Sequence, residues 1–176
     1  MQVRTRFTLP IAVLVVCAAA LLAAPGAADA QAGPPPSVRL DIHGDFGWYN
    51  NGGAGLRVDI PIVREGFIHG SSVSDDLSIS PGLDMLWWYG AYDGIGFIPM
   101  VMVQWNIYFA QKFSFLIELG LAGIWGPSAS WNNRYYSNYI APTGQLGFRW
   151  HFSDALALLV RVGWPAGAQV GLAIDL

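Results

Sequence analysis

Hydrophobic and polar positions alternate most clearly in residues 94–126. Residues 95–109 carry no charge and are apolar enough to suggest a transmembrane helix. Each helical residue turns about 100°, so Gln104 and Asn106 would lie on nearly opposite faces of a helix, whereas in a strand they share one face. Gly96, Pro99 and the β-branched residues also disfavour a helix. The pattern therefore predicts a strand.

The alternation resumes after a short turn at residues 110–112. Phe113, Phe115 and Ile117 fall on one face of the second arm, while Ser114 and Glu118 fall on the other. We therefore predict a hairpin of two long strands with one apolar face and one small or polar face. A soluble sheet would bury the apolar face, so the hairpin alone does not decide between water and lipid outside.

Six further strands are predicted by the same alternation. Asn and Gly at residues 50–53 tolerate positive φ and predict a hairpin turn. The other connections are predicted at residues 64–76, 90–94, 127–139, 153–154 and 165–167. An even number of strands of about ten residues is typical of small membrane barrels. We predict an all-β fold: an eight-stranded antiparallel up-and-down transmembrane β-barrel, preceded by a cleaved signal peptide.

The N-terminal residues predict export. Residues 1–30 combine Arg4 and Arg6, an apolar run over residues 9–24, and a small-x-small cleavage pattern that ends at Ala30. We divide the chain into a signal peptide (1–30), a Gly/Pro linker (31–36) and an outer-membrane β-barrel domain (37–176). The leader is excluded from the fold.

Cysteine content and charge exclude several functions. Cys17 lies inside the predicted signal and follows Val16, where a lipoprotein signal needs a small residue, so no lipid attachment is expected. The mature chain has no disulfide, thiolate nucleophile or cysteine metal site. Without the signal, 9 basic and 12 acidic residues become 7 and 11, a net charge of −4 that argues against a nucleic-acid partner.

Charged side chains within the predicted strands all share the polar face. Strand one carries most weight, because Arg39, Asp41 and Asp45 are in phase with His43. A charge facing lipid costs about 2–4 kcal/mol near the midplane, and net fold stability is only about 5–15 kcal/mol. The predicted lumenal ion-pair network is Arg39, Asp41, His43, Asp45, Arg57, Asp59, Asp84, Glu118, Arg149, His151, Arg161 and Asp175.

Aromatic residues on the apolar face sort by height if alternate strands run up and down. Two belts around an aliphatic band are what a surface meeting two membrane interfaces requires, and a soluble core has no reason to form them. One belt contains Phe46, Trp48, Trp87, Tyr89, Phe97, Trp125 and Trp164, and the other contains Trp105, Phe109, Phe113, Phe115, Trp150 and Phe152.

This alternation and these belts resemble small eight-stranded outer-membrane barrels, the class of the OmpA transmembrane domain and of OmpX. The resemblance is architectural, carries no family-specific motif and covers nearly the whole mature chain. It implies the outer membrane of a Gram-negative bacterium, with membrane lipid, lipopolysaccharide and the barrel-insertion machinery as partners. The chain departs from the class by ending in Leu176 rather than an aromatic residue. We predict a monomer with a structural or envelope-interaction role.

The predicted lumen is a plug rather than a pore. Eight strands leave an interior just wide enough for side chains to fill it. The alternative is a proton- or metal-responsive site that combines His43 or His151 with Asp41, Asp45 or Asp59. Since no His-x-x-x-His or comparable spacing exists, we predict no metal site and no cofactor.

Two alternative functions remain, a lipid A-modifying hydrolase and a soluble ligand carrier. Residues 134–138 are similar to the His-Tyr-Ser-Asn segment of outer-membrane lipid A deacylases, with Ser137 in the nucleophile's place. The base position holds Tyr135, which cannot take the serine's proton at neutral pH, and no matching acid follows. His69 and Ser71 have a suitable spacing but lie on the periplasmic side by strand parity. The last alternative is a soluble periplasmic lipocalin-like carrier, which needs a polar outside.

Overall fold

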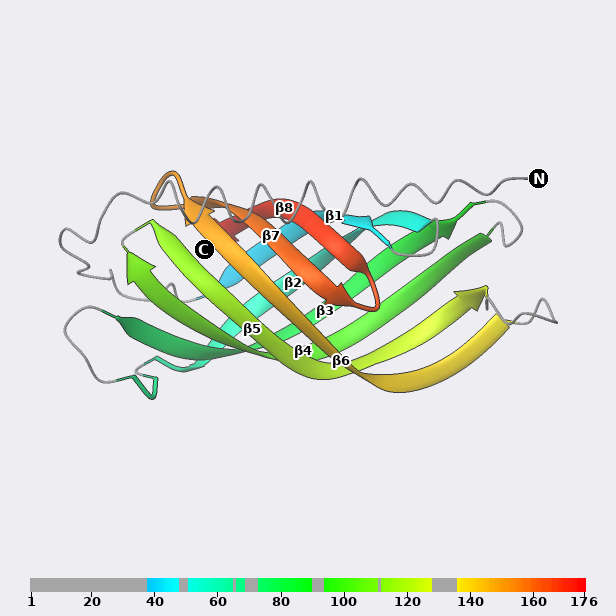
Figure 1. Ribbon diagram of the computed structural model, residues 1–176, viewed down its shortest axis with the longest axis horizontal. Helices are drawn as coiled ribbons and strands as arrows, with labels where there is room; N and C mark the ends of the chain where they lie inside the picture. The colour runs from blue at the N-terminus through cyan, green and yellow to red at the C-terminus, as the bar shows by residue number, and fades with distance from the viewer. Residues whose placement is uncertain are drawn as a thin grey trace, which may run out of the picture.

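The computed structural model describes residues 38–47, 51–64, 66–68, 73–89, 94–110, 112–127 and 136–176; the predicted signal peptide and linker lie outside them. In this part of the chain eight antiparallel strands form a closed barrel in sequential order, with β1 paired to β8 (Figure 1). The predicted eight-stranded antiparallel barrel is thereby confirmed. The strands are β1 Arg39–Phe46, β2 Asn51–Val63, β3 Ser74–Trp88, β4 Gly94–Ala110, β5 Phe113–Pro127, β6 Tyr136–His151, β7 Leu156–Trp164 and β8 Gly167–Asp175.

The hairpin of β4 and β5 has the strand conformation that its alternation predicted. Gln104 pairs with Glu118 across the hairpin, and Gln104 and Asn106 both point into the barrel with no exposed surface. Because both amides lie on one face, their hydrogen-bonding groups share a single polar environment. Among the described residues, no helix is long and apolar enough to cross a membrane.

One wall of the barrel is longer than the other. Strands β3 to β6 have 15 to 17 residues, whereas β1, β7 and β8 have 8 or 9. β6 pairs with β5 from Tyr136 onward, but its pairing with β7 begins only at Gly144. In Figure 1 the long strands accordingly extend to the right beyond the turn between β7 and β8.

The predicted turn at residues 50–53 is wrong in its position. Asn51, Gly52 and Gly53 belong to β2, because Gly52 pairs with Phe46 on one side and Asn51 pairs with Trp88 on the other. The ladder to both neighbours outweighs the turn preference of Asn and Gly.

Two predicted connections are also too long. β3 begins at Ser74, so Asp75 and Asp76 lie in the strand rather than in the connection over residues 64–76. They pair with Ile107 and Asn106 of β4, and these neighbours give polar residues a reason to extend the ladder. The loop predicted at residues 127–139 likewise ends earlier, since β6 starts at Tyr136.

Closure of the barrel is directly testable by cross-linking. Ile42 and Leu172 pair directly across β1 and β8, and both side chains are exposed on the outer surface. Paired Cβ atoms on one face are about 4.5–5.5 Å apart, close to the separation of about 3.5–4.5 Å in a disulfide. Oxidation of the mature Ile42→Cys/Leu172→Cys variant should therefore form an intramolecular disulfide, detected by gel mobility.

A matched control places the second cysteine on another wall. Ile42→Cys/Leu119→Cys joins β1 to β5, which are not neighbours in the ring, and should stay reduced. Failure of the first pair to cross-link, or equal cross-linking of both, would contradict the closed ring.

Candidate functional site

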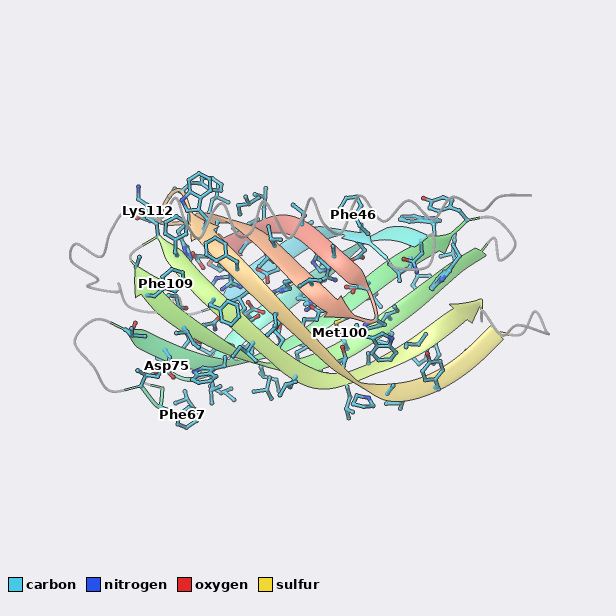
Figure 2. All side chains as sticks on the ribbon, in the orientation of Figure 1. Phe46, Phe67, Asp75, Met100, Phe109 and Lys112 are labelled. Atoms are coloured by element: carbon cyan, nitrogen blue, oxygen red, sulfur yellow. The ribbon has the colours of Figure 1, made fainter. Side chains whose placement is uncertain are left out.

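The barrel interior holds the charged residues that the alternation grouped together. Figure 2 draws the side chains on the ribbon of the barrel. Asp175 and His151 lie near one mouth, with 13% and 17% of their side chains exposed. The remaining members of the predicted network are at most 3% exposed: Arg39, Asp41, His43, Asp45, Arg57, Asp59, Asp84, Glu118, Arg149 and Arg161.

Arg57 of β2 connects four strands. Its Nη1 donates to Oε2 of Glu118 and to Oε1 of Gln145, both at 2.9 Å, and its Nη2 donates to Oε1 of Gln169 at 3.0 Å. These partners come from β5, β6 and β8. Charge-assisted hydrogen bonds of this kind are roughly twice as strong as neutral ones, so Arg57 ties opposite walls together.

Two more arginines extend the network. Arg161 donates through Nη2 to Asp41, and its Nε lies 3.0 Å from Oε1 of Glu118. Arg149 donates through Nη2 to Oδ2 of Asp59 at 3.0 Å. Glu118 therefore bridges Arg57 and Arg161, and the ion pairs cross the lumen rather than run along one wall.

Neutral polar side chains complete the network, and the sequence analysis did not include them. Gln104 donates to Asp59 at 3.0 Å, while Asn106 donates to Oδ1 of Asp76 at 2.6 Å. Tyr108 donates its hydroxyl proton to Oδ2 of Asp76 at 2.7 Å. The alternation of the strands could have identified the amides as lumenal, because they lie on the same face as the charged residues.

A small ion cluster near one mouth is formed by side chains from β1, β6 and β8. Nε of Arg39 donates to Oδ1 of Asp175 at 2.6 Å, and His151 Nε2 lies 3.9 Å from Asp175 Oδ2. Arg39 and Asp175 are also paired across the β1–β8 ladder, so this contact sits at the closure of the ring.

Part of the interior is apolar, whereas the alternation predicted a lumenal face of small or polar residues. Leu86, Ile98, Met100, Met102 and Ala122 form a buried cluster, with Trp88 and Ile124 packed against it. All come from β3, β4 and β5, in the long wall. Leu86 and Trp88 lie on the same face of β3 as Asp84, so the alternation could have placed them in the lumen. The lumen therefore combines an ionic section with an apolar one.

His43 meets a partner that the sequence did not assign to it. Its Nε2 lies 3.1 Å from Oδ1 of Asp84 and 3.7 Å from Oδ1 of Asp45, all three side chains having no exposed surface. Asp41 and Asp59, the other carboxylates considered for His43, contact arginines instead. One ligand atom from each of His43, Asp45 and Asp84 falls within 4.8 Å of the others, so these residues could hold a metal ion.

The outer surface is aliphatic in its middle section. Exposed aliphatic side chains come from every strand: Ile42, Leu56, Leu83, Val101, Val103, Leu119, Leu121, Leu146, Val162, Val170 and Leu172.

The belt aromatics of the described residues share the outer face of the strands with these aliphatic residues. Phe46, Tyr89, Phe97, Trp125, Trp164, Trp150 and Phe152 are exposed, and Trp87, Trp105, Phe109, Phe113 and Phe115 are partly buried. Trp48 lies outside the described residues. Phe148, an aromatic residue that the belt prediction omitted, makes ring contacts with Phe109 and Phe113, and Phe113 in turn stacks with Trp150.

Asp75 organises the start of the connection after β2. Its carboxylate accepts the backbone N–H groups of Phe67 and Ile68 at 2.9 and 2.8 Å, and the indole N–H of Trp105 at 2.6 Å. Figure 2 shows Phe67 and Asp75 near one another at the same end of the barrel. The carboxylate therefore fixes this segment against Trp105.

The deacylase-like alternative rests on side chains that lie outside the described part of the chain. Ser137 lies in β6, but its side chain is outside the described residues, as are Tyr135, His69 and Ser71.

Comparisons with known proteins support the fold. No protein-family model matches the chain, and neither does any curated protein. Among solved structures, a barrel from a study entitled "De novo design of transmembrane beta-barrels" is 14% identical, with a TM-score of 0.57 over 83% of this chain and 100% of that one. The N-terminal β-barrel domain of Pseudomonas aeruginosa OprF is 11% identical, with a TM-score of 0.56 over 81% of this chain and 98% of that one. The chain therefore shares the fold of eight-stranded membrane barrels.

The bridge between Arg57 and Glu118 gives a measurable coupling. Removing one partner of a buried ion pair costs about 3–5 kcal/mol, because the other charge is left uncompensated. Arg57→Met and Glu118→Gln should each lower the free energy of unfolding by this order, and the double variant should lose clearly less than the sum. Urea unfolding of the barrel refolded in lipid vesicles measures all three values.

Lys112→Ala provides the control. Lys112 is exposed at the turn between β4 and β5, and its replacement should change the unfolding free energy by less than about 0.5 kcal/mol. Strictly additive losses for Arg57→Met and Glu118→Gln would contradict the proposed coupling.

Proposed function

We propose that this chain is a monomeric outer-membrane β-barrel whose lumen is plugged by side chains and whose role is structural or in envelope interaction. The observation that carries the proposal is the reversed arrangement of polarity: ionised residues fill the centre while aliphatic residues cover the outside. A water-soluble barrel gains by the opposite arrangement, since burial of apolar surface is its main driving force.

Lipid as the surrounding medium is supported by the extent of the aliphatic surface. Leu119 and Leu121 remain 65% and 58% exposed in the middle of β5. Soluble monomers rarely expose contiguous apolar patches larger than a few hundred Å². A lipocalin-like carrier would need a polar outer face, which these strands do not provide.

A monomer is supported because all eight strands contribute exposed aliphatic side chains. No sector of the described barrel presents a polar stripe to a neighbouring subunit. Lipid, lipopolysaccharide and the barrel-insertion machinery are the partners that such a surface fits.

The plug is supported by the ion pairs that cross the lumen. Arg57, Arg161 and Glu118 link β2, β5 and β7, and their side chains have no exposed surface. Eight-stranded barrels have interiors that side chains fill, whereas water-filled channels occur in much larger barrels. These ion pairs favour a network that fills the lumen of the described barrel over one that lines an aqueous path.

The membrane orientation predicts a depth-dependent effect of charge. Leu119→Arg places a charge in the middle of the aliphatic band and should lower the unfolding free energy in vesicles by about 2–4 kcal/mol. Ile62→Arg, at the end of β2, should cost only about 0–1 kcal/mol because a charge there reaches the interface. Equal costs at both positions would be inconsistent with a bilayer around the band.

The plug predicts an electrically silent protein. Purified barrel inserted into a planar lipid bilayer should produce no stable conductance steps, while a general porin in the same bilayer should conduct. Heat-modifiable gel mobility of the same sample shows that the barrel is folded. Reproducible ohmic steps from folded protein would refute the plug without affecting the membrane assignment.

A further inference from the structure

We propose that His43, Asp45 and Asp84 form a binding site for one divalent transition-metal ion, with Zn²⁺ as the representative ion. The three residues project into the lumen from β1 and β3, on either side of β2. The proposal concerns a site within the barrel and does not depend on which role the protein has in the envelope.

The spacing of the three side chains fits a small tetrahedral ion. Zinc binds histidine nitrogen and carboxylate oxygen at about 2.0–2.2 Å, so neighbouring ligand atoms of a tetrahedral site are about 3.3–3.5 Å apart. Nε2 of His43 lies 3.1 Å from Oδ1 of Asp84 and 3.7 Å from Oδ1 of Asp45. These two separations bracket the value that the ion requires, so binding needs only small side-chain rotations.

The charge of the lumen favours a cation at this point. The predicted network contains six carboxylates and four arginines, which leaves an excess of two negative charges. Asp45 has only His43 as an ion-pair partner among the described residues, and the nearest arginine of Asp84 is Arg57 at 3.7 Å. Arg57 is already bonded to Glu118 at 2.9 Å. A divalent ion would neutralise the excess where the arginines do not.

Unpartnered atoms supply an independent sign. Oδ2 of Asp45 and Nδ1 of His43 are buried and lack a hydrogen-bond partner among the described residues. Buried polar groups are nearly always bonded, and an exception calls for an explanation such as an ion. Asp45 thus has a buried oxygen that is free to bind a metal ion held by Nε2 of His43.

Neighbouring groups hold the carboxylates in position. Nε2 of Gln169 donates to Oδ1 of Asp45 at 2.7 Å and to Oδ2 of Asp84 at 3.1 Å. This contact to both carboxylates is what an outer-shell residue of a metal site provides. Gly55 of β2 makes the approach possible, because a Cβ there would lie 2.2 Å from Asp84 Oδ1 and 2.5 Å from His43 Nε2.

The donor set selects the class of ion. One imidazole nitrogen and two carboxylate oxygens suit Zn²⁺ and other first-row divalent ions, whereas Ca²⁺ and Mg²⁺ prefer sites made of oxygen alone. The competing explanation is a protonated His43 that bridges the two carboxylates without any ion. Metal titration distinguishes the two.

The experiment uses the mature, tag-free chain refolded in detergent and cleared of metal with a chelator. Calorimetric titration with ZnCl₂ should give one ion per barrel, and Co²⁺ should show the visible absorption of a nitrogen- and oxygen-ligated tetrahedral ion. His43→Gln and Asp45→Asn should each weaken Zn²⁺ binding by at least about tenfold, the lower end of the loss seen even for outer-shell partners. Heat-modifiable mobility confirms that each variant has folded.

The control is His151→Gln, which removes the histidine of β6 that lies near Asp175, outside the proposed site, and should leave Zn²⁺ binding unchanged. Three results would overturn the proposal: no stoichiometric binding of Zn²⁺ or Co²⁺ by folded wild type, unchanged binding in folded His43→Gln and Asp45→Asn, or stronger binding of Ca²⁺ than of Zn²⁺. Because these readouts involve neither bilayer stability nor conductance, they fail or succeed independently of the proposed function.

Discussion

Everything in this structure depends on keeping ionised side chains inside a closed ring. Strand parity leaves only two faces, and a one-residue slip of β1 would turn Arg39, Asp41 and Asp45 outward together. Within the barrel these charges meet partners from other walls, as Asp41 does with Arg161. Closure of the ring therefore has two effects. It removes the exposed strand edges, and it brings a polar or charged side chain next to each buried charge.

The alternation in the sequence was sufficient to predict the strands, their antiparallel order and the face of each charged residue. Its period of two is insensitive to where a strand ends, which explains why the ends were misplaced. Asn51 and Gly52 have turn preferences, yet the ladders on both sides of β2 hold them extended. Asp75 and Asp76 looked like loop residues, but their pairing with β4 and their contacts with Trp105 and Tyr108 place them in β3.

The sequence could not predict which side chains contact one another inside the lumen, and the reason is different. Parity says that a side chain points inward, but the tilt and stagger of the strands decide which inward residues meet. His43 was expected near Asp41, Asp45 or Asp59; it lies 3.7 Å from Asp45, and the arrangement of the strands adds Asp84 at 3.1 Å. The same stagger separates an ionic section around Arg57 from an apolar section around Met100. These two sections give the lumen different properties at different heights.

The central claim is that this barrel is closed and takes its stability from lipid around an aliphatic surface. The most direct measurement is cell fractionation combined with gel mobility of heated and unheated samples. The account predicts that the protein is recovered with the outer membrane and that the unheated form migrates differently from the heated form. Recovery of the mature chain as a detergent-free soluble protein, with one mobility before and after heating, would contradict it.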